Sequence, residues 1–252
     1  MMSKKTSRAV VGAVVAAAGL VAAGAVPASA VHGGKTVSGS PSFAVVLENP
    51  DGSQWCGGTL IAPDKVLTAG HCLMNAADPK SLLVVGGRSD LSSTGGQVRH
   101  IAKFKVAPDF NWNLDHDAAV ITLDKPLPYK PLPLAKKTDT ALYRNGRTAT
   151  VYGWGMTGPG VLGGKLKQAT LTLAPQDSCA PFTDPGDTRD LRVCGLPRTG
   201  TTDSICSGDS GGPLVADGKL IGIVSTGNKY CDTQYPLSVF TKVSAVAPEL
   251  GL

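Results

Sequence analysis

Short segments rich in β-forming residues, each closed by turn residues, limit most strongly what this chain can fold into. Glycine (31 residues) and proline (18 residues) are abundant, and Asp-Gly, Pro-Asp and Gly-Gly pairs separate the segments. The pattern predicts an all-β chain in which only the tail after Val243 is helical. The segments are residues 42–47, 55–61, 66–68, 82–85, 98–106, 118–123, 148–152, 166–173, 191–193, 213–215, 220–225 and 237–243.

A proline-rich, charged stretch divides these segments into two sets. It runs from Asp124 to Thr140 and has neither the helical nor the strand period. We therefore expect two β-barrels packed together around a cleft. The expected boundaries are a first barrel over residues 31–126, a linker over 127–146 and a second barrel over 147–252. In the second barrel, Asp217-Gly218 is predicted to form a tight I′ hairpin turn.

Residues 1–30 have the composition of a secretory signal peptide. Basic residues precede an uncharged apolar run over 9–26, and the small residues Ala28-Ser29-Ala30 follow. A membrane anchor is the alternative, but a run made mostly of alanine, glycine and valine inserts weakly. We expect cleavage after Ala30 and a secreted, extracellular protein.

The balance of charge argues against a polyanionic partner. The complete chain has 24 Lys and Arg against 19 Asp and Glu, and three of the basic residues lie in the signal segment. Without those three, the net charge falls from +5 to +2. A charge this small does not indicate nucleic acid or an anionic membrane as partner. We expect neither a nucleic-acid partner nor a membrane association once the signal is removed.

The cysteines indicate disulfides rather than a metal. The chain has six of them, an even number, and exported chains favour disulfide bonds. A zinc site is the alternative, but there is no C-x-x-C, and the neighbours His71 and Cys72 are poorly placed as two ligands of one tetrahedral ion. Glu48 and Glu249 are the only glutamates, so the chain is poorly supplied with carboxylates for a calcium site. We expect three disulfides and no metal.

Three short segments carry the chemistry of the chain: T-A-G-H-C at 68–72, D-H-D-A-A-V-I-T-L at 115–123 and G-D-S-G-G-P at 208–213. Glycines around Ser210 permit a tight turn whose backbone N–H groups converge on one point. A serine hydroxyl is a weak nucleophile unless a base such as His71 takes its proton. A carboxylate such as Asp117 would fix the tautomer of that imidazole. Each segment alone is common, but the three in this order are specific.

With these segments the chain resembles the chymotrypsin/trypsin family of serine endopeptidases, over essentially all of residues 31–252. The resemblance implies two six-stranded antiparallel β-barrels with the active site between them, and a short C-terminal helix. It also implies a monomer that hydrolyses protein or peptide substrates through an acyl-enzyme, without metal or cofactor. His71 would be the general base, Asp117 its orienting partner and Ser210 the nucleophile.

The choice within each residue type follows the neighbouring sequence. Asp117 is preferred to Asp115 because A-A-V-I-T-L follows it directly, as in the family. His32, His100 and His116 lack the matching context.

The same resemblance assigns further residues. The N–H groups of Gly208 and Ser210 would form the oxyanion hole, Ser225 would hydrogen-bond the triad aspartate, and Gly227 would pair with the substrate strand. The disulfides implied are Cys56–Cys72, Cys179–Cys194 and Cys206–Cys231.

Specificity depends on the residue six positions before the nucleophile, where family members that select Arg or Lys carry aspartate. Here it is Ser204, which would leave the floor of the specificity pocket uncharged, and Ile205 beside it would narrow the pocket. We therefore expect cleavage after apolar residues. Asp203 lies one residue earlier, and a shift in register would bring its carboxylate into the pocket. Thr226 stands where the family usually has tryptophan, which predicts weaker subsites away from the cut bond. One extra residue leaves Leu237 and Ser238 as rival residues for the pocket wall.

The start of the expected mature chain resembles the activation motif of the family. Val31-His32-Gly33-Gly34 matches Ile/Val-x-Gly-Gly, whose α-amino group pairs with the aspartate before the nucleophile, here Asp209. The alternative is that Val31 merely begins a strand. Because residues 28–30 adjoin Val31 directly, we expect signal cleavage itself to release the activating terminus, without a zymogen propeptide.

Two other functions are compatible with parts of the sequence. A catalytically silent relative would act as a secreted binding protein, but such relatives normally lose a triad residue, and this chain keeps all three. An esterase of another fold would carry G-x-S-x-G, which residues 208–212 fit, but in the chain order Ser, Asp, His. The order here is His, Asp, Ser, so we expect an active endopeptidase.

Overall fold

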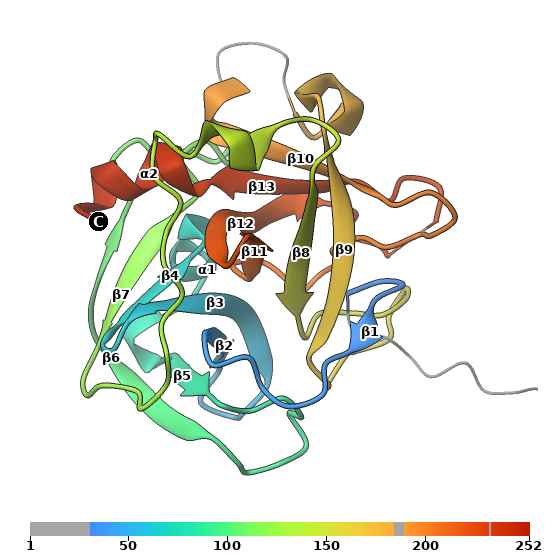
Figure 1. The fold of residues 1–252 in the computed structure, drawn as a ribbon. Helices are drawn as coiled ribbons and strands as arrows, with labels where there is room; N and C mark the ends of the chain where they lie inside the picture. The colour runs from blue at the N-terminus through green and yellow to red at the C-terminus, as the bar shows by residue number, and fades with distance from the viewer. Residues whose placement is uncertain (1–30, 184–188, 232) are drawn as a thin grey trace, which may run out of the picture.

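The computed structural model describes residues 31–183, 189–231 and 233–252. The predicted signal segment, residues 1–30, lies outside this part of the chain. The described chain is mainly β and forms two closed antiparallel barrels, as predicted (Figure 1). Among the described residues, no helix is long and apolar enough to cross a membrane.

The first barrel closes in the order β2-β3-β4-β7-β6-β5. Strand β2 is buried along its whole length because its two faces meet different cores. Val45 and Leu47 point into the barrel, whereas Ala44 and Val46 pack against Trp154 of the second barrel. The strands are β2 (Ala44–Glu48), β3 (Gln54–Ala62), β4 (Lys65–Thr68), β5 (Leu83–Gly86), β6 (Gln97–Val106) and β7 (Ala119–Leu123).

The second barrel closes in the order β9-β10-β13-β12-β11-β8, with β8 pairing back to β9. The turn at Asp217-Gly218 has positive φ at both residues, 46° and 69°, which confirms the predicted hairpin between β11 and β12. The strands are β8 (Thr148–Gly153), β9 (Lys167–Ala174), β10 (Arg192–Pro197), β11 (Pro213–Ala216), β12 (Lys219–Gly227) and β13 (Ser238–Lys242).

The first strand of the described chain belongs to the second barrel. Strand β1 (Lys35–Thr36) pairs with β9, and Figure 1 shows it beside that strand rather than among β2 to β7. It is too short and too polar for the period-2 pattern to reveal it. The sequence-based boundaries at 126/127 and 146/147 stay predictions, but residues 35–36 pair away from the first barrel to which the sequence assigned them.

The segment predicted as a linker crosses between the barrels and contacts both. Leu132 N–H donates to Leu60 O of the first barrel at 2.9 Å, and Ala135 N–H donates to Leu220 O of the second at 2.9 Å. Four of its apolar side chains are buried, which explains the leucines in this proline-rich, charged stretch; they are Leu127, Leu132, Ala135 and Leu142. Apart from a 3₁₀ turn at Thr140–Tyr143 it has no regular structure.

The C-terminal helix α2 (Val243–Leu250) is present as predicted and ends at Gly251, whose φ of 80° suits glycine. A second helix, α1 (Gly70–Met74), was not predicted: the expectation that only the tail is helical was wrong. At five residues, α1 is too short to show a helical period. Other one-turn 3₁₀ helices are Pro79–Ser81, Gln176–Cys179 and Arg189–Leu191.

The six cysteines are all joined in the structure, as Cys56–Cys72, Cys179–Cys194 and Cys206–Cys231. The first disulfide ties β3 to helix α1, and the third ties residues just before Ser210 to the loop after β12. Two of the three therefore fix segments that border the cleft.

Candidate active site

His71 and Asp117 are brought together by the pairing of β4 with β7. Thr68 at the end of β4 lies opposite Ala119 at the start of β7, so the residues just beyond them meet. The backbone N–H of His71 donates to Asp117 Oδ1 at 2.9 Å, and His71 Nδ1 lies 2.8 Å from Oδ2. Because an ionised carboxylate only accepts hydrogen bonds, Nδ1 carries the hydrogen and Nε2 is left as an acceptor.

Asp117 is fully buried and held from the second barrel as well. Ser225 Oγ donates to Asp117 Oδ2 at 2.6 Å, the contact expected from the sequence. Thr241 Oγ1 donates to the backbone carbonyl of Asp117 at 2.9 Å, a contact for which the sequence carries no signal. A buried carboxylate is costly unless hydrogen-bonded, and the donors from His71 and Ser225 meet that need.

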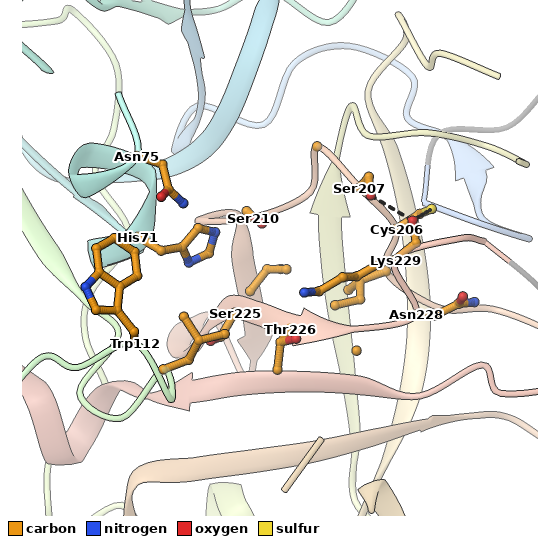
Figure 2. Close-up of a pocket in the computed structure, with 15 residues that line it drawn as sticks. His71, Asn75, Trp112, Cys206, Ser207, Ser210, Ser225, Thr226, Asn228 and Lys229 are labelled. Atoms are coloured by element: carbon orange, nitrogen blue, oxygen red, sulfur yellow. Dashed lines mark hydrogen bonds between the residues drawn. The ribbon is translucent and has the colours of Figure 1, made fainter. Parts of the chain in front are cut away.

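Ser210 stands in the tight loop before β11, fastened to both barrels. Its carbonyl accepts from Gly57 N–H of β3 at 2.7 Å, and the next residue, Gly211, donates to Val224 O of β12 at 2.8 Å. Gly211 has a φ of 80°, and a Cβ there would strike Thr68 Oγ1 and Gly57 O. Ser210 thus lies beside the imidazole of His71 (Figure 2), although no hydrogen bond joins the two side chains in the described chain. Such bonds often tighten only with substrate.

Two peptide planes in this loop point their N–H groups in fixed directions. Met156 N–H donates to Ser207 O at 2.7 Å, which sets the plane whose other end is the Gly208 N–H. Gly212 N–H donates to Asp209 O at 2.9 Å and sets the plane of the Ser210 N–H in the same way. No described residue accepts from either N–H. Both remain available for an anionic oxygen.

A cavity of about 250 Å³ opens beside Ser210 (Figure 2). Ser207, Gly208 and residues 224–229 line it, so β12 forms one wall, with Thr226 and Gly227 along it. Trp112 and Leu114 also line it. No described residue that lines it is Asp or Glu, and Lys229 is its one Lys or Arg.

The residues expected at the base of this cavity take distinct places. Ser204 is fully buried, and its Oγ accepts from Asn228 Nδ2 at 3.0 Å. Asp203 instead packs against Gly33 of the N-terminal segment. Burial raises the pKa of its carboxyl, and the positive charges nearby only partly offset this rise. The alternative register that would bring Asp203 into the cavity is therefore not adopted.

Leu237 and Ser238, the two residues expected as alternatives for the pocket wall, both lie outside the cavity lining. Ser238 is fully buried, and its Oγ accepts from Ile205 N–H at 3.1 Å. Leu237 packs on the Cys179–Cys194 disulfide, outside the cavity. Neither residue lines the cavity itself.

The N-terminal segment inserts into the second barrel. Val31 is fully buried, and Ser204 N–H donates to His32 O at 3.0 Å, which forms a short antiparallel bridge. Gly34 N–H donates to Val31 O at 2.8 Å. The Val31 nitrogen belongs to the peptide bond with Ala30 in this chain and carries no charge.

Asp209 is a fully buried carboxylate without an ion pair among the described residues. It accepts from Gly155 N–H and from Cys206 N–H, each at 2.8 Å. Burial raises the pKa of Asp209 to about 7, because these two donors only partly offset the loss of water. A cation beside Asp209 would therefore be strongly favoured.

Comparison with known proteins identifies the family. The family model described as trypsin matches residues 30–249. The chain belongs to the trypsin family. It is 37% identical over 205 residues to a trypsin of Saccharopolyspora erythraea, covering 81% of this chain and 88% of the relative. It is 34% identical over 197 residues to trypsin iota of Drosophila melanogaster, covering 77% and 76%.

The fold of this trypsin-family chain is shared with solved structures. One similar structure is the human heparin binding protein, with a TM-score of 0.73 and 25% identity over 88% of this chain and 96% of that one. Family membership makes the chain a serine endopeptidase that acts on protein or peptide substrates.

Two groups of side chains in the trypsin-family chain lie close enough together to hold a metal. In the first, Cys56 and Cys72 are joined in a disulfide and have no thiolate to donate to an ion beside His71. In the second, Asp109 lies near His116 and Glu249, but His116 Nδ1 and Glu249 Oε2 already form an ion pair at 2.8 Å. That the enzyme needs no metal or cofactor stays a prediction.

Several residues of this site carry no recognisable sequence signal. Gln54 Nε2 donates to Gly208 O at 2.8 Å, across more than half of the chain. Asn228 and Thr241 likewise act through contacts with residues far away in sequence. Only a knowledge of which strands pair could have located them.

Proposed function

We propose that the chain is a secreted serine endopeptidase that cleaves through an acyl-enzyme, with Ser210 as nucleophile, His71 as base and Asp117 as orienting carboxylate. The observation that carries this proposal is the geometry around Asp117. The buried carboxylate accepts from His71 and Ser225, which fixes the imidazole with Nε2 free to accept a proton. The hydrogen bond from Gly57 N–H to Ser210 O holds the loop that carries Ser210 and supports its assignment as the nucleophile.

The proposed reaction proceeds in two halves. Ser210 Oγ attacks the carbonyl carbon of the substrate while its proton passes to His71 Nε2, and the carbonyl oxygen becomes an anion facing the N–H groups of Gly208 and Ser210. His71 then gives the proton to the leaving amine as the C–N bond breaks, which leaves an ester on Ser210. Water attacks this ester with His71 again as base, which frees the acid product and Ser210.

We propose that the residue before the cut bond is apolar. The cavity beside Ser210 has no carboxylate among its described lining residues, and the uncharged Ser204 lies behind one of them, Asn228, whose Nδ2 donates to Ser204 Oγ. A Lys or Arg side chain would lose its water there without a negative partner, and burying an unpaired charge is costly. Cleavage of a peptide library tests this, and dominant cutting after Lys or Arg would contradict it.

We also propose that export and activation are one event, without a zymogen propeptide. Cleavage after Ala30 would convert the Val31 amide into an ammonium group, and Asp209 is a buried carboxylate of the same barrel that would take it as partner. N-terminal sequencing of active enzyme from the culture medium tests this. Active protein that begins elsewhere than at Val31 would refute it.

The alternative is a catalytically silent secreted protein that binds a partner. The similar human structure is named heparin binding protein, so its name refers to binding and not to proteolysis. A net charge of +2 after signal removal argues against a polyanion as partner of this chain.

Covalent labelling separates the two functions. A fluorophosphonate probe should modify wild type and Ser207→Ala, a control hydroxyl in the same cavity, but not Ser210→Ala. No labelling of wild type would favour the silent alternative. Equal labelling of wild type and Ser210→Ala would mean that another residue is the nucleophile.

A further inference from the structure

The segment 113–116, directly before Asp117, contains two residues with a strained backbone. Leu114 and His116 have φ values of 64° and 50°, in the left-handed region that residues other than glycine rarely adopt. Five of the described non-glycine residues have positive φ, and these two lie within three residues of Asp117. Such conformations persist only where surrounding contacts hold them. The contacts that hold this segment therefore bear on the place of Asp117.

Arg192 of β10 holds the first part of this segment from the second barrel. Its Nη2 donates to Asn113 O at 2.7 Å and lies 2.9 Å from Asp115 Oδ1, so one nitrogen bridges the residues on both sides of Leu114. Its Nη1 donates to Phe182 O at 2.8 Å. The side chains of Arg192 and Asp115 are both largely buried, so their ion pair is shielded from water. The planar guanidinium thus fixes the peptide groups around Leu114.

Glu249 of helix α2 holds the second part of the segment. Its Oε2 lies 2.8 Å and its Oε1 3.0 Å from His116 Nδ1, which carries the hydrogen because an ionised carboxylate only accepts. Lys105 Nζ donates to the backbone carbonyl of Glu249 at 2.7 Å, which holds this end of the helix. The imidazole of His116 therefore has its direction set by a residue that lies 133 positions later in the chain.

The backbone of His116 is bonded directly to the residue after Asp117. Ala118 N–H donates to His116 O at 2.7 Å, which closes a three-residue turn with Asp117 at its centre. A rotation of the His116 backbone towards an ordinary φ would move this turn. The carboxylate of Asp117 would then leave its place, in which Oδ2 lies 2.8 Å from His71 Nδ1.

We infer that Arg192 and Glu249 are positioning residues for Asp117. They hold the segment 113–116 in its strained conformation, so that the carboxylate of Asp117 stays directed at His71. Both act through other residues, since neither lines the cavity beside the nucleophile. The inference rests on the proposed function, because it takes Asp117 as the carboxylate that orients the base.

The first test separates the chemical step from substrate binding. Glu249→Ala leaves the ring of His116 without its acceptor, and we expect kcat on a peptide substrate to fall roughly tenfold while KM stays within about twofold. Glu249→Gln should recover most of the lost kcat, because the amide oxygen can still accept from His116 Nδ1. Arg192→Lys keeps a cation beside Asp115 but loses the fork that reaches three acceptors, so kcat should again fall with little change in KM.

Proton NMR gives a second readout, which a general loss of stability would not move. The Nδ1–H of His71 is bonded to a carboxylate and should give a low-field signal in Ser210→Ala protein, assigned by its absence after His71→Ala. We expect Glu249→Ala to move this signal to higher field, because the hydrogen bond weakens.

Asp139→Ala serves as the matched control. The Asp139 carboxylate also forms an ion pair of 2.8 Å, with Lys219 at the start of β12, and neither residue lines the cavity beside Ser210. This variant should keep the wild-type kcat and the wild-type NMR signal.

Each other outcome would contradict the inference in its own way. An unchanged kcat or an unchanged NMR signal in Glu249→Ala would overturn the role of Glu249, and an unchanged kcat in Arg192→Lys would overturn that of Arg192. An equal fall in kcat in Asp139→Ala would overturn both roles, since lost stability would then explain the effect. Fluorophosphonate labelling of Ser210 separates these failures from failure of the proposed function, which would abolish labelling in wild type.

Discussion

The buried carboxylate of Asp209 leads to a prediction in which one substitution has opposite effects in two forms of the chain. The first form begins at Val31 and has a free α-amino group. The second keeps Ala30, so that the Val31 nitrogen stays an uncharged amide. We expect Asp209→Asn to destabilise the first form and to stabilise the second above neutral pH.

The magnitude follows from the pKa of Asp209, which burial raises from 3.8 to about 7 when no cation is present. The folded chain then binds more protons than the unfolded chain between these values, so stability falls as pH rises through that window. The loss is complete above about pH 7 and amounts to roughly 4 kcal/mol, at about 1.4 kcal/mol per pH unit. The amide side chain introduced by Asp209→Asn has no charge to bury, so the Ala30 form of this variant escapes the loss.

In the form that begins at Val31, an ammonium group can neutralise the carboxylate. Removing the carboxylate would then leave the ammonium buried and unpaired, which commonly costs about 3–5 kcal/mol. We therefore expect Asp209→Asn to lower the free energy of unfolding by about this amount in that form, with loss of peptidase activity.

The assay is urea unfolding followed by tryptophan fluorescence from pH 4 to pH 8, in a Ser210→Ala background that prevents self-digestion. Asp51→Asn is the control, since Asp51 lies exposed in a surface turn and should give the same result in both forms. Destabilisation of equal size in both forms would refute the reasoning, because Asp209 would then act only through its contacts with Gly155 and Cys206.

Three further predictions concern contacts around the cleft. Ser225→Ala removes the 2.6 Å bond to Asp117 and should lower kcat by about tenfold with little change in KM, measured on a peptide substrate. Arg192→Met removes the guanidinium whose Nη2 lies 2.9 Å from Asp115 Oδ1, and it leaves this largely buried carboxylate without its cation. The variant should have a free energy of unfolding about 3 kcal/mol lower. Adding Asp115→Asn should recover part of that loss in urea unfolding, and no recovery would contradict the pairing. Ser204→Asp should redirect library cleavage towards Lys and Arg, since a carboxylate would then stand beside Asn228, which lines the cavity.

The parts of the fold that follow from local sequence could be predicted. The period of the strands, the Asp-Gly turn at 217–218 and the three motifs around His71, Asp117 and Ser210 each depend on a few neighbouring residues. Helix α1 escaped because five residues show no period, although it holds His71. Strand β1 escaped because two polar residues form a strand only when β9 is beside them.

The contacts that complete the site depend on tertiary structure. Thr241 reaches the carbonyl of Asp117 only because β12 and β13 pair as they do, and Gln54 reaches Gly208 only because the two barrels touch. The place of Asp203 could not be read from its neighbours either. It depends on Gly33, a residue of the N-terminal segment packed against it.

The bridge between His32 and Ser204, together with the pairing of β1 and β9, sets an order of assembly for the molecule. The ribosome delivers residues 31–36 early, but their docking place is made of β9 and the segment around Ser204, which are synthesised much later. A nascent or truncated chain that ends before the second barrel therefore lacks the strand with which residues 35–36 pair. The N-terminal segment can therefore take its place in the second barrel only after β9 and the segment around Ser204 have been synthesised.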